Sequence, residues 1–476
     1  MDEGRAPDPA SEPAEPPLVA EPVDAFEAVE PIDVQPIEPR RPGRATIALV
    51  IVLILAFISF AVVGGRILIA GPETTPRPEP RLAVTDAAGH LHTVDAKGSS
   101  VVDYPAPGVE FGFPTWSPDG TRIAVTGDAK DSTGIYVFDA ADPAAKPTII
   151  YDSADVPPFY AYWSPDGSHV AFLAQEPDKI ALEVAPADGS AKATVIREGA
   201  PLYWDWLGSD HVVAHVGSSG AGSFLGEVAL DGTSAEQVPL SAGLFRSPAV
   251  SHDGAYRAYV TSGNDSDGTV TVESADRSHR TTAPAFGSTA VSFDPAGATL
   301  AYVAKTKPVA ADLGFPLGPL QAIDPQSGQT RTLLDGDVIG FFWSPDGKTI
   351  AALTLKSTGN EVVGIDGAQL ASAVRPGSGA LRDDASLAYV PMTLSFVDVA
   401  SGTTRAHRAV APSSKFVNGI LPYFDQYALS HRIWAPDSSA IALPGFGNGG
   451  DQLYAIPVDG SEPTALDGAV FGFWSP

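Results

Sequence analysis

The residues best suited to binding or catalysis lie close together near the C-terminus. They combine aromatic rings with a carboxylate, an amide and an imidazole: Tyr423, Phe424, Asp425, Gln426, Tyr427 and His431. Such a mixture is typical of an interface core or a ligand pocket, so we predict that these six residues bind a ligand or partner. Asp425 and His431 could also act as a catalytic base and acid. Alternatively, the rings pack inside the fold and Asp425 caps a turn, because buried aromatic side chains often serve packing alone.

Patterns that could bind a metal are weaker. Asp265, Asp267 and Gly268 resemble part of a calcium loop, but further oxygen ligands and the distal glutamate are missing. We interpret this stretch as a solvated hairpin tip. Two histidine pairs have spacings that suit one side of a strand: His90 with His92, and His211 with His215. Neither pair has a third ligand nearby, so we expect no metal and no other cofactor.

Charge and cysteine content exclude several classes of protein. The 57 acidic and 29 basic residues give a formal net charge of -28, which repels a polyanion. Nucleic acid is therefore not an expected partner. The chain has no cysteine, which excludes disulfides, thiolate metal sites and cysteine nucleophiles.

A repeat must position these side chains. One phrase recurs, with an aromatic residue, a Ser-Pro-Asp-Gly turn and an apolar run: TWSPDGTRIAVTG from Thr115, YWSPDGSHVAFLA from Tyr162, FWSPDGKTIAALT from Phe342 and IWAPDSSAIALPG from Ile433. Weaker copies begin at Asp205, Val250 and Ser292. Because Pro-Asp-Gly favours a tight turn, we assign Asp119, Asp166 and Asp346 to structure.

Each copy predicts a four-stranded antiparallel unit of the kind that forms the blades of a β-propeller, an all-β fold. The segment FGFWSP at residues 471–476 is a first strand without a second, and residues 81–105 supply second, third and fourth strands without a first. We therefore expect the two ends to close the ring. The count is eight blades, or seven if one weak copy is not a full blade.

The phrase resembles the TolB-like β-propeller repeat, also called WD40-like or PD40, over about residues 81–476. This resemblance implies a fold but no single function, since the family includes scaffolds, partner-binding proteins and domains fused to peptidases. A fused peptidase would need an α/β domain with a G-x-S-x-G motif, which is missing. The stretch LPYFDQYALSHRIWAPDS at residues 421–438 also resembles membrane-anchored actinobacterial members, which implies a cell-envelope setting.

The N-terminal part predicts a membrane anchor. Residues 1–44 are an acidic, Pro-rich tail expected to be disordered, and nineteen uncharged residues then run from Ala45 to Val63. We predict a transmembrane helix at 45–66, since a cleaved signal peptide would have a shorter tail and apolar run. Arginines precede this helix, which places the N-terminus in the cytoplasm and the propeller outside. Residues 67–80 form a Pro-rich linker.

Long connections are expected on one face of the disc. They are residues 306–319, an insertion at about 356–392, and the crossing at 411–430. Because long loops in compact folds are often functional, this face is the predicted binding surface for an envelope protein or a cell-wall glycan. The alternative is a hydrolase or lyase that acts on an envelope polymer at the same face. We expect a binding protein rather than an enzyme.

Overall fold

The computed structural model describes residues 79–217, 223–237, 247–262, 267–307, 315–355, 392–447 and 450–476. The chain divides into two units, Met1–Arg77 and Pro78–Pro476, and all the described residues belong to the second. Among the described residues, no helix has the length and apolar character needed to cross a bilayer. The predicted tail, the predicted transmembrane helix and most of the predicted linker lie outside these ranges, as does the insertion at 356–391.

Three four-stranded antiparallel sheets follow the order of the chain. They consist of β4 (Val109–Trp116), β5 (Arg122–Ala129), β6 (Thr133–Asp139) and β7 (Thr148–Ser153); β8 (Pro158–Trp163), β9 (His169–Gln175), β10 (Ile180–Pro186) and β11 (Thr194–Gly199); and β12 (Leu202–Leu207), β13 (His211–Val216), β14 (Phe224–Ala229) and β15 (Ser234–Gln237). The predicted four-stranded antiparallel unit is confirmed in these sheets.

A fourth sheet draws its strands from both ends of the unit. Its order is β29 (Phe471–Trp474), β1 (Leu82–Thr85), β2 (Leu91–Val94) and β3 (Val102–Asp103). β29 and β1 pair antiparallel, with Leu82 opposite Trp474 and Thr85 opposite Phe471. The Ser475 N–H also donates to the Arg81 carbonyl at 2.8 Å.

The remaining strands form a ten-stranded sheet and a three-stranded sheet. The larger one contains β16 (Ala249–Val250), β17 (Tyr256–Ser262), β18 (Asp267–Ser274), β19 (Arg280–Phe293), β20 (Leu300–Lys305), β21 (Gly318–Ile323), β22 (Thr330–Trp343), β23 (Thr349–Leu355), β24 (Met392–Asp398) and β25 (Thr404–Val410). The smaller one contains β26 (Ala440–Gly447), β27 (Gly450–Pro457) and β28 (Thr464–Leu466). β19 and β22 have 14 residues each, and both contain a register shift.

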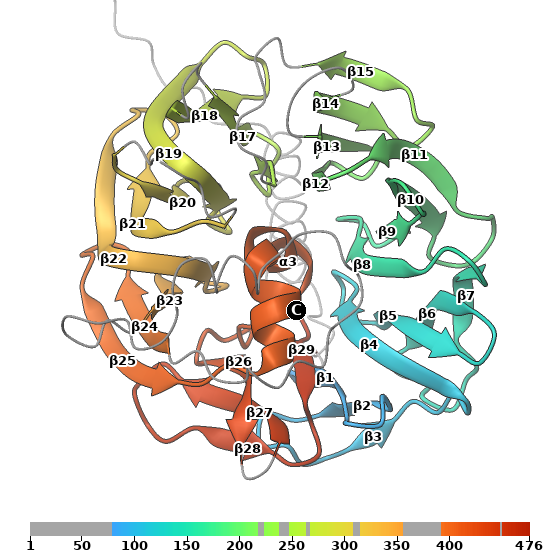
Figure 1. Cartoon of the computed structure of the whole chain (residues 1–476). Coiled ribbons are helices and arrows are strands. Elements are labelled where there is room, and N and C mark those ends of the chain that lie inside the picture. Colours follow the sequence, from blue (N-terminus) through green and yellow to red (C-terminus); the bar gives the residue numbers. More distant parts are fainter. Residues whose placement is uncertain are drawn as a thin grey trace, which may run out of the picture. The chain divides into compact units, whose positions relative to one another are not determined.

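Figure 1 shows these sheets following one another around a central helix, α3 (Phe424–Ser430). Apart from α3 and the two short helical turns that precede it, the described elements are strands. The predicted all-β class is therefore confirmed.

The Ser-Pro-Asp-Gly turns share one pattern of hydrogen bonds. Ser117 Oγ donates to Asp119 Oδ1 at 2.6 Å, and the backbone N–H two residues beyond the aspartate donates to the same oxygen at 3.0 Å. The turns that contain Asp166 and Asp346 repeat both contacts, as does the divergent copy that contains Asp253. Since these carboxylates satisfy the turn itself, the structural role predicted for Asp119, Asp166 and Asp346 is confirmed.

The tryptophans that occupy the same position in successive copies of the repeat join one sheet to the one before it. Each indole N–H donates to a backbone carbonyl of the preceding repeat, and the acceptor stands one residue before the position equivalent to the tryptophan. The bonds run from Trp116 to Phe473 at 3.1 Å, Trp163 to Thr115 at 3.1 Å, Trp343 to Ser292 at 3.1 Å and Trp434 to Phe342 at 3.0 Å. These bonds are buried or partly buried, so each contributes about 1 kcal/mol to the contact between neighbouring sheets.

Candidate functional site

The predicted binding residues belong to a helical segment at the centre of the ring (Figure 1). A π-helical turn at Phe416–Ile420 and a 3-10 turn at Leu421–Tyr423 lead directly into α3. Apolar side chains recur at helical spacing and are buried: Phe416, Val417, Ile420, Leu421, Phe424 and Tyr427. A helix that is apolar on most of its sides is stable only when protein surrounds it, as it does here.

Five of the six predicted site residues are buried. Phe424 is 0% exposed, Asp425 1%, Gln426 3%, Tyr427 8% and His431 2%, whereas Tyr423 is partly buried. The structure thus brings the six together, but inside the ring. The expectation that residues 411–430 form a surface loop was wrong, because their apolar side chains pack against the inner strands. The packing alternative describes Phe424 and Tyr427, and ligand binding by the six residues stays a prediction.

Gln426 fixes the helix to two inner strands. Its Oε1 accepts the Trp204 N–H at 3.0 Å, and its Nε2 donates to the Trp204 carbonyl at 2.7 Å. Nε2 also donates to the Tyr160 hydroxyl at 2.9 Å, and that hydroxyl donates to the Gln426 carbonyl at 2.6 Å. Only an amide side chain offers both an acceptor and donors in this arrangement. The Gln426 side chain therefore bonds to the backbone of β12 as a neighbouring strand would.

His431 fixes the other end of the helix. Its Nδ1 lies 2.6 Å from Ser430 Oγ, and its Nε2 lies 3.4 Å from the Phe113 carbonyl. Its ring packs edge-on against Phe473, with 4.6 Å between centroids. Burial lowers the pKa of His431 to about 3, so the imidazole is neutral at physiological pH. A neutral, enclosed imidazole suits packing.

Bulges in the inner strands aim aromatic rings at α3. β4 and β8 shift register beside Phe113 and Tyr160, whose φ angles of 54° and 51° lie in the left-handed region. Their rings lie 5.8 Å and 5.1 Å from that of Tyr427. Gly340 occupies the corresponding place in β22, and a Cβ there would lie 2.9 Å from Leu421 Cδ1. Glycine therefore makes room for the helix on that side.

Asp205 is a buried polar residue that the sequence did not single out. Its Oδ2 accepts the Val250 N–H at 2.7 Å, and its Oδ1 accepts the Trp206 N–H at 2.8 Å and the Tyr162 hydroxyl at 3.2 Å. Burial raises the pKa of Asp205 to about 7, although these hydrogen bonds lower it. The carboxyl group connects three sheets through β8, β12 and β16. The weak copy that begins at Asp205 was the available signal, because it places an acid where the strong copies begin with Thr115, Tyr162, Phe342 or Ile433.

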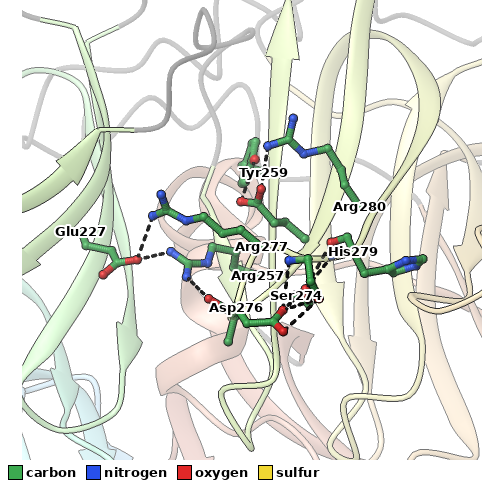
Figure 2. Close-up of polar contacts among 11 residues, drawn as sticks. Glu227, Arg257, Tyr259, Ser274, Asp276, Arg277, His279 and Arg280 are labelled. Atoms are coloured by element: carbon green, nitrogen blue, oxygen red, sulfur yellow. Dashed lines mark hydrogen bonds and ion pairs between the residues drawn. The ribbon is translucent and has the colours of Figure 1, made fainter.

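A charged network joins β14 to β17 (Figure 2). Glu227 accepts Arg257, and it also lies 3.5 Å from Arg277. Arg280 donates to Glu273 at 2.6 Å. Glu227 thus joins β14 to the neighbouring sheet, whereas Arg280 and Glu273 pair between β18 (Asp267–Ser274) and β19 (Arg280–Phe293) of one sheet.

The histidine pairs do not form a metal centre in the part of the chain that the structure describes. No group of three or more His, Cys, Asp or Glu side chains gathers there. His90 Nδ1 lies 2.9 Å from Asp86 Oδ2, and His211 Nδ1 lies 3.0 Å from Asp210 Oδ1. Asp265 lies outside the described residues.

Comparison with known proteins finds TolB proteins and a prolyl endopeptidase among the similar solved structures. No family model matches the chain, and no curated protein matches it. Similar solved structures include TolB from Acinetobacter baumannii, at 15% identity over 54% of this chain and 63% of that chain, with a TM-score of 0.34. A TolB protein from Agrobacterium tumefaciens is 18% identical over 54% of this chain and 90% of that chain, with a TM-score of 0.31. A prolyl endopeptidase is 11% identical over 76% of this chain and 50% of that chain, with a TM-score of 0.47. At these identities and TM-scores we draw no conclusion about this chain from the likeness.

Proposed function

We propose that this chain is an interaction module of the cell envelope, of the membrane-anchored actinobacterial TolB-like type. A transmembrane helix at 45–66 holds the propeller outside the cell, and the N-terminus is cytoplasmic. The propeller has eight blades, with β19 and β22 each shared between two of them and the pairing of β29 with β1 closing the ring. The sequence supports the anchor, because its uncharged run follows Arg40, Arg41 and Arg44.

The observation that carries this proposal is the filled centre of the ring. A ligand that entered along the axis would have to displace α3, whose Phe424, Asp425 and Gln426 are almost fully buried. Such a displacement would also break the Gln426 bonds to Trp204. We therefore place the binding of a partner on the outer surface of the propeller. The hydrolase or lyase alternative needs an acid and a base that a substrate can reach, whereas Asp425 and His431 are both buried.

The connections at one end of the sheets are the best candidates for the binding surface. β1 and β2 are joined by residues 86–90, and β9 and β10 by residues 176–179. The corresponding strands β20 and β21 are joined by 306–317, and β23 and β24 by 356–391. Leu355 and Met392 pair with each other, so the longest segment is an insertion in a hairpin. Long insertions on a rigid scaffold usually serve recognition.

The partner is an envelope protein or a neutral cell-wall glycan. The part of the chain after residue 71 has 46 acidic and 24 basic residues, a net charge of -22, which disfavours an anionic polymer because like charges repel at the distance of contact. It also disfavours nucleic acid. The proposal therefore predicts capture of an uncharged or basic partner from the envelope.

Crosslinking and co-purification from intact membranes test the proposal. One variant replaces residues 361–385 with a short Gly-Ser linker. A matched control replaces residues 142–146, which lie in the exposed turn between β6 and β7 at the opposite end of the sheets. We expect a partner that is recovered with the wild type and the control but lost with the variant. Equal recovery from all three, or no partner, would contradict the proposed surface.

A further inference from the structure

A cavity of about 360 Å³ lies between β25 and the three-stranded sheet. Leu443 on β26 and Ile456 on β27 are buried residues of the main hydrophobic core, and they line it together with Val410 and Tyr454. The volume falls in the range of pockets that bind small molecules, about 300–1,000 Å³. An apolar lining that is continuous with the core favours a ligand with an apolar body.

One guanidinium group lines the same cavity. Arg408 Nη2 donates to the carbonyls of Gly460 and Ser461 at 3.1 Å and 3.0 Å, which fixes the position of the side chain. Its Nη1 donates to Glu462 Oε2 at 3.2 Å. The Glu462 side chain is 92% exposed, whereas that of Arg408 is 30% exposed. An exposed ion pair of this kind is weak, so a ligand carboxylate can replace that of Glu462.

We propose that this cavity binds a small carboxylate with an apolar body. The carboxylate pairs with Arg408 Nη1 in place of Glu462, and the apolar body lies against Val410, Leu443 and Ile456. Charge complementarity selects this class, because a guanidinium group binds carboxylates with charge-assisted hydrogen bonds. A neutral molecule of the same shape would leave Glu462 on Arg408 and gain only the apolar contact.

Binding of 4-phenylbutyrate to the full chain in a maltoside detergent tests this site, with calorimetry or saturation-transfer NMR as the readout. Its uncharged amide, 4-phenylbutyramide, is the matched ligand, and detergent without protein is the blank. We expect saturable binding of the acid with a dissociation constant of about 1 mM or below, and at least about tenfold weaker binding of the amide.

Two substitutions at the cavity have opposite expected effects. Arg408→Gln should weaken binding of the acid at least about tenfold, because it removes the charged donor. Glu462→Gln should strengthen binding up to about fivefold, because the competing carboxylate is gone. The control is Arg331→Gln, an exposed arginine that does not line the cavity, and it should leave binding unchanged.

The proposal is overturned if acid and amide bind equally, if no saturable binding occurs at millimolar concentration, or if Glu462→Gln weakens binding. Since Glu462 is exposed, its variant keeps the test valid even if Arg408→Gln fails to fold.

Discussion

Replacement of Asp205 by asparagine measures how much a buried carboxyl group costs this fold. The residue is 3% exposed, and burial raises its pKa from 3.8 to about 7. The folded state therefore binds the proton more tightly than the unfolded state, and stability falls as pH rises from about 4 to about 7. At about 1.4 kcal/mol per pH unit, the full loss is roughly 4 kcal/mol.

Asparagine is uncharged like the protonated acid, but both carboxyl oxygens of Asp205 accept backbone N–H groups, so its NH2 group must face the N–H of Val250 or of Trp206 and loses one of these bonds. This loss lowers the stability of the variant by the same amount at every pH. We expect the stabilities of Asp205→Asn relative to the wild type at pH 5.5 and at pH 8 to differ by about 2 kcal/mol, with the larger value at pH 8, because only the wild type has to release a proton on going from one pH to the other. Urea unfolding monitored by tryptophan fluorescence gives both values, and this pH range keeps the acidic chain soluble.

The opposite result would refute the reasoning. If the stability of Asp205→Asn relative to the wild type does not rise between pH 5.5 and pH 8, the N–H groups of Val250 and Trp206 stabilise the ionised carboxylate at least as much as burial destabilises it. Asp210→Asn is the control. The pKa of Asp210 is lowered by its hydrogen bond from His211, so this variant should not gain stability on the wild type as pH rises.

Three further substitutions test the contacts at the centre and between sheets. Gln426→Leu leaves the N–H and the carbonyl of Trp204 without their partner and should cost about 2–5 kcal/mol in urea unfolding, whereas Lys415→Ala, at an exposed position, should cost less than about 0.5 kcal/mol. Trp163→Phe should cost about 1 kcal/mol more than Trp206→Phe in the same assay. The Trp163 indole N–H donates to the Thr115 carbonyl, while the buried Trp206 indole N–H has no hydrogen-bond partner in the described structure. Equal costs would contradict the role given to the indole bonds. Gly340→Ala should cost about 1–3 kcal/mol by crowding Leu421, and the double variant with Leu421→Ala should cost less than the sum of the two single variants in the same assay.

The repeat predicted most of the strands because its turns are local. The bonds from Ser117 and from the following backbone N–H to Asp119 depend on residues within one turn, so the sequence reveals them. The pairing of β29 with β1 is visible in the sequence for a different reason. Residues 471–476 supply a first strand without a second, and residues 81–105 supply the second to fourth strands without a first.

The helix at the centre was not predicted, although part of its signal was present. Phe416, Ile420, Phe424 and Tyr427 follow helical spacing, but the segment was interpreted as a crossing between strands. The bulge at Tyr160 and the burial of Asp205 depend on contacts with other sheets, so no local pattern shows them. The six candidate residues are neighbours in the sequence, but the burial of five of them depends on the tertiary structure.

Pairing of β29 with β1 constrains the order in which the protein can be assembled during synthesis. β1 is made early and its open edge has no partner until residues 471–474 leave the ribosome. Until then the nascent chain presents an unpaired strand edge, which is a site for mispairing with other chains. The 416–430 segment is also made late, after β4, β8, β12, β19 and β22, whose residues it contacts. Assembly of the interior therefore waits for nearly the whole chain, and the edge of β1 stays unpaired throughout that interval.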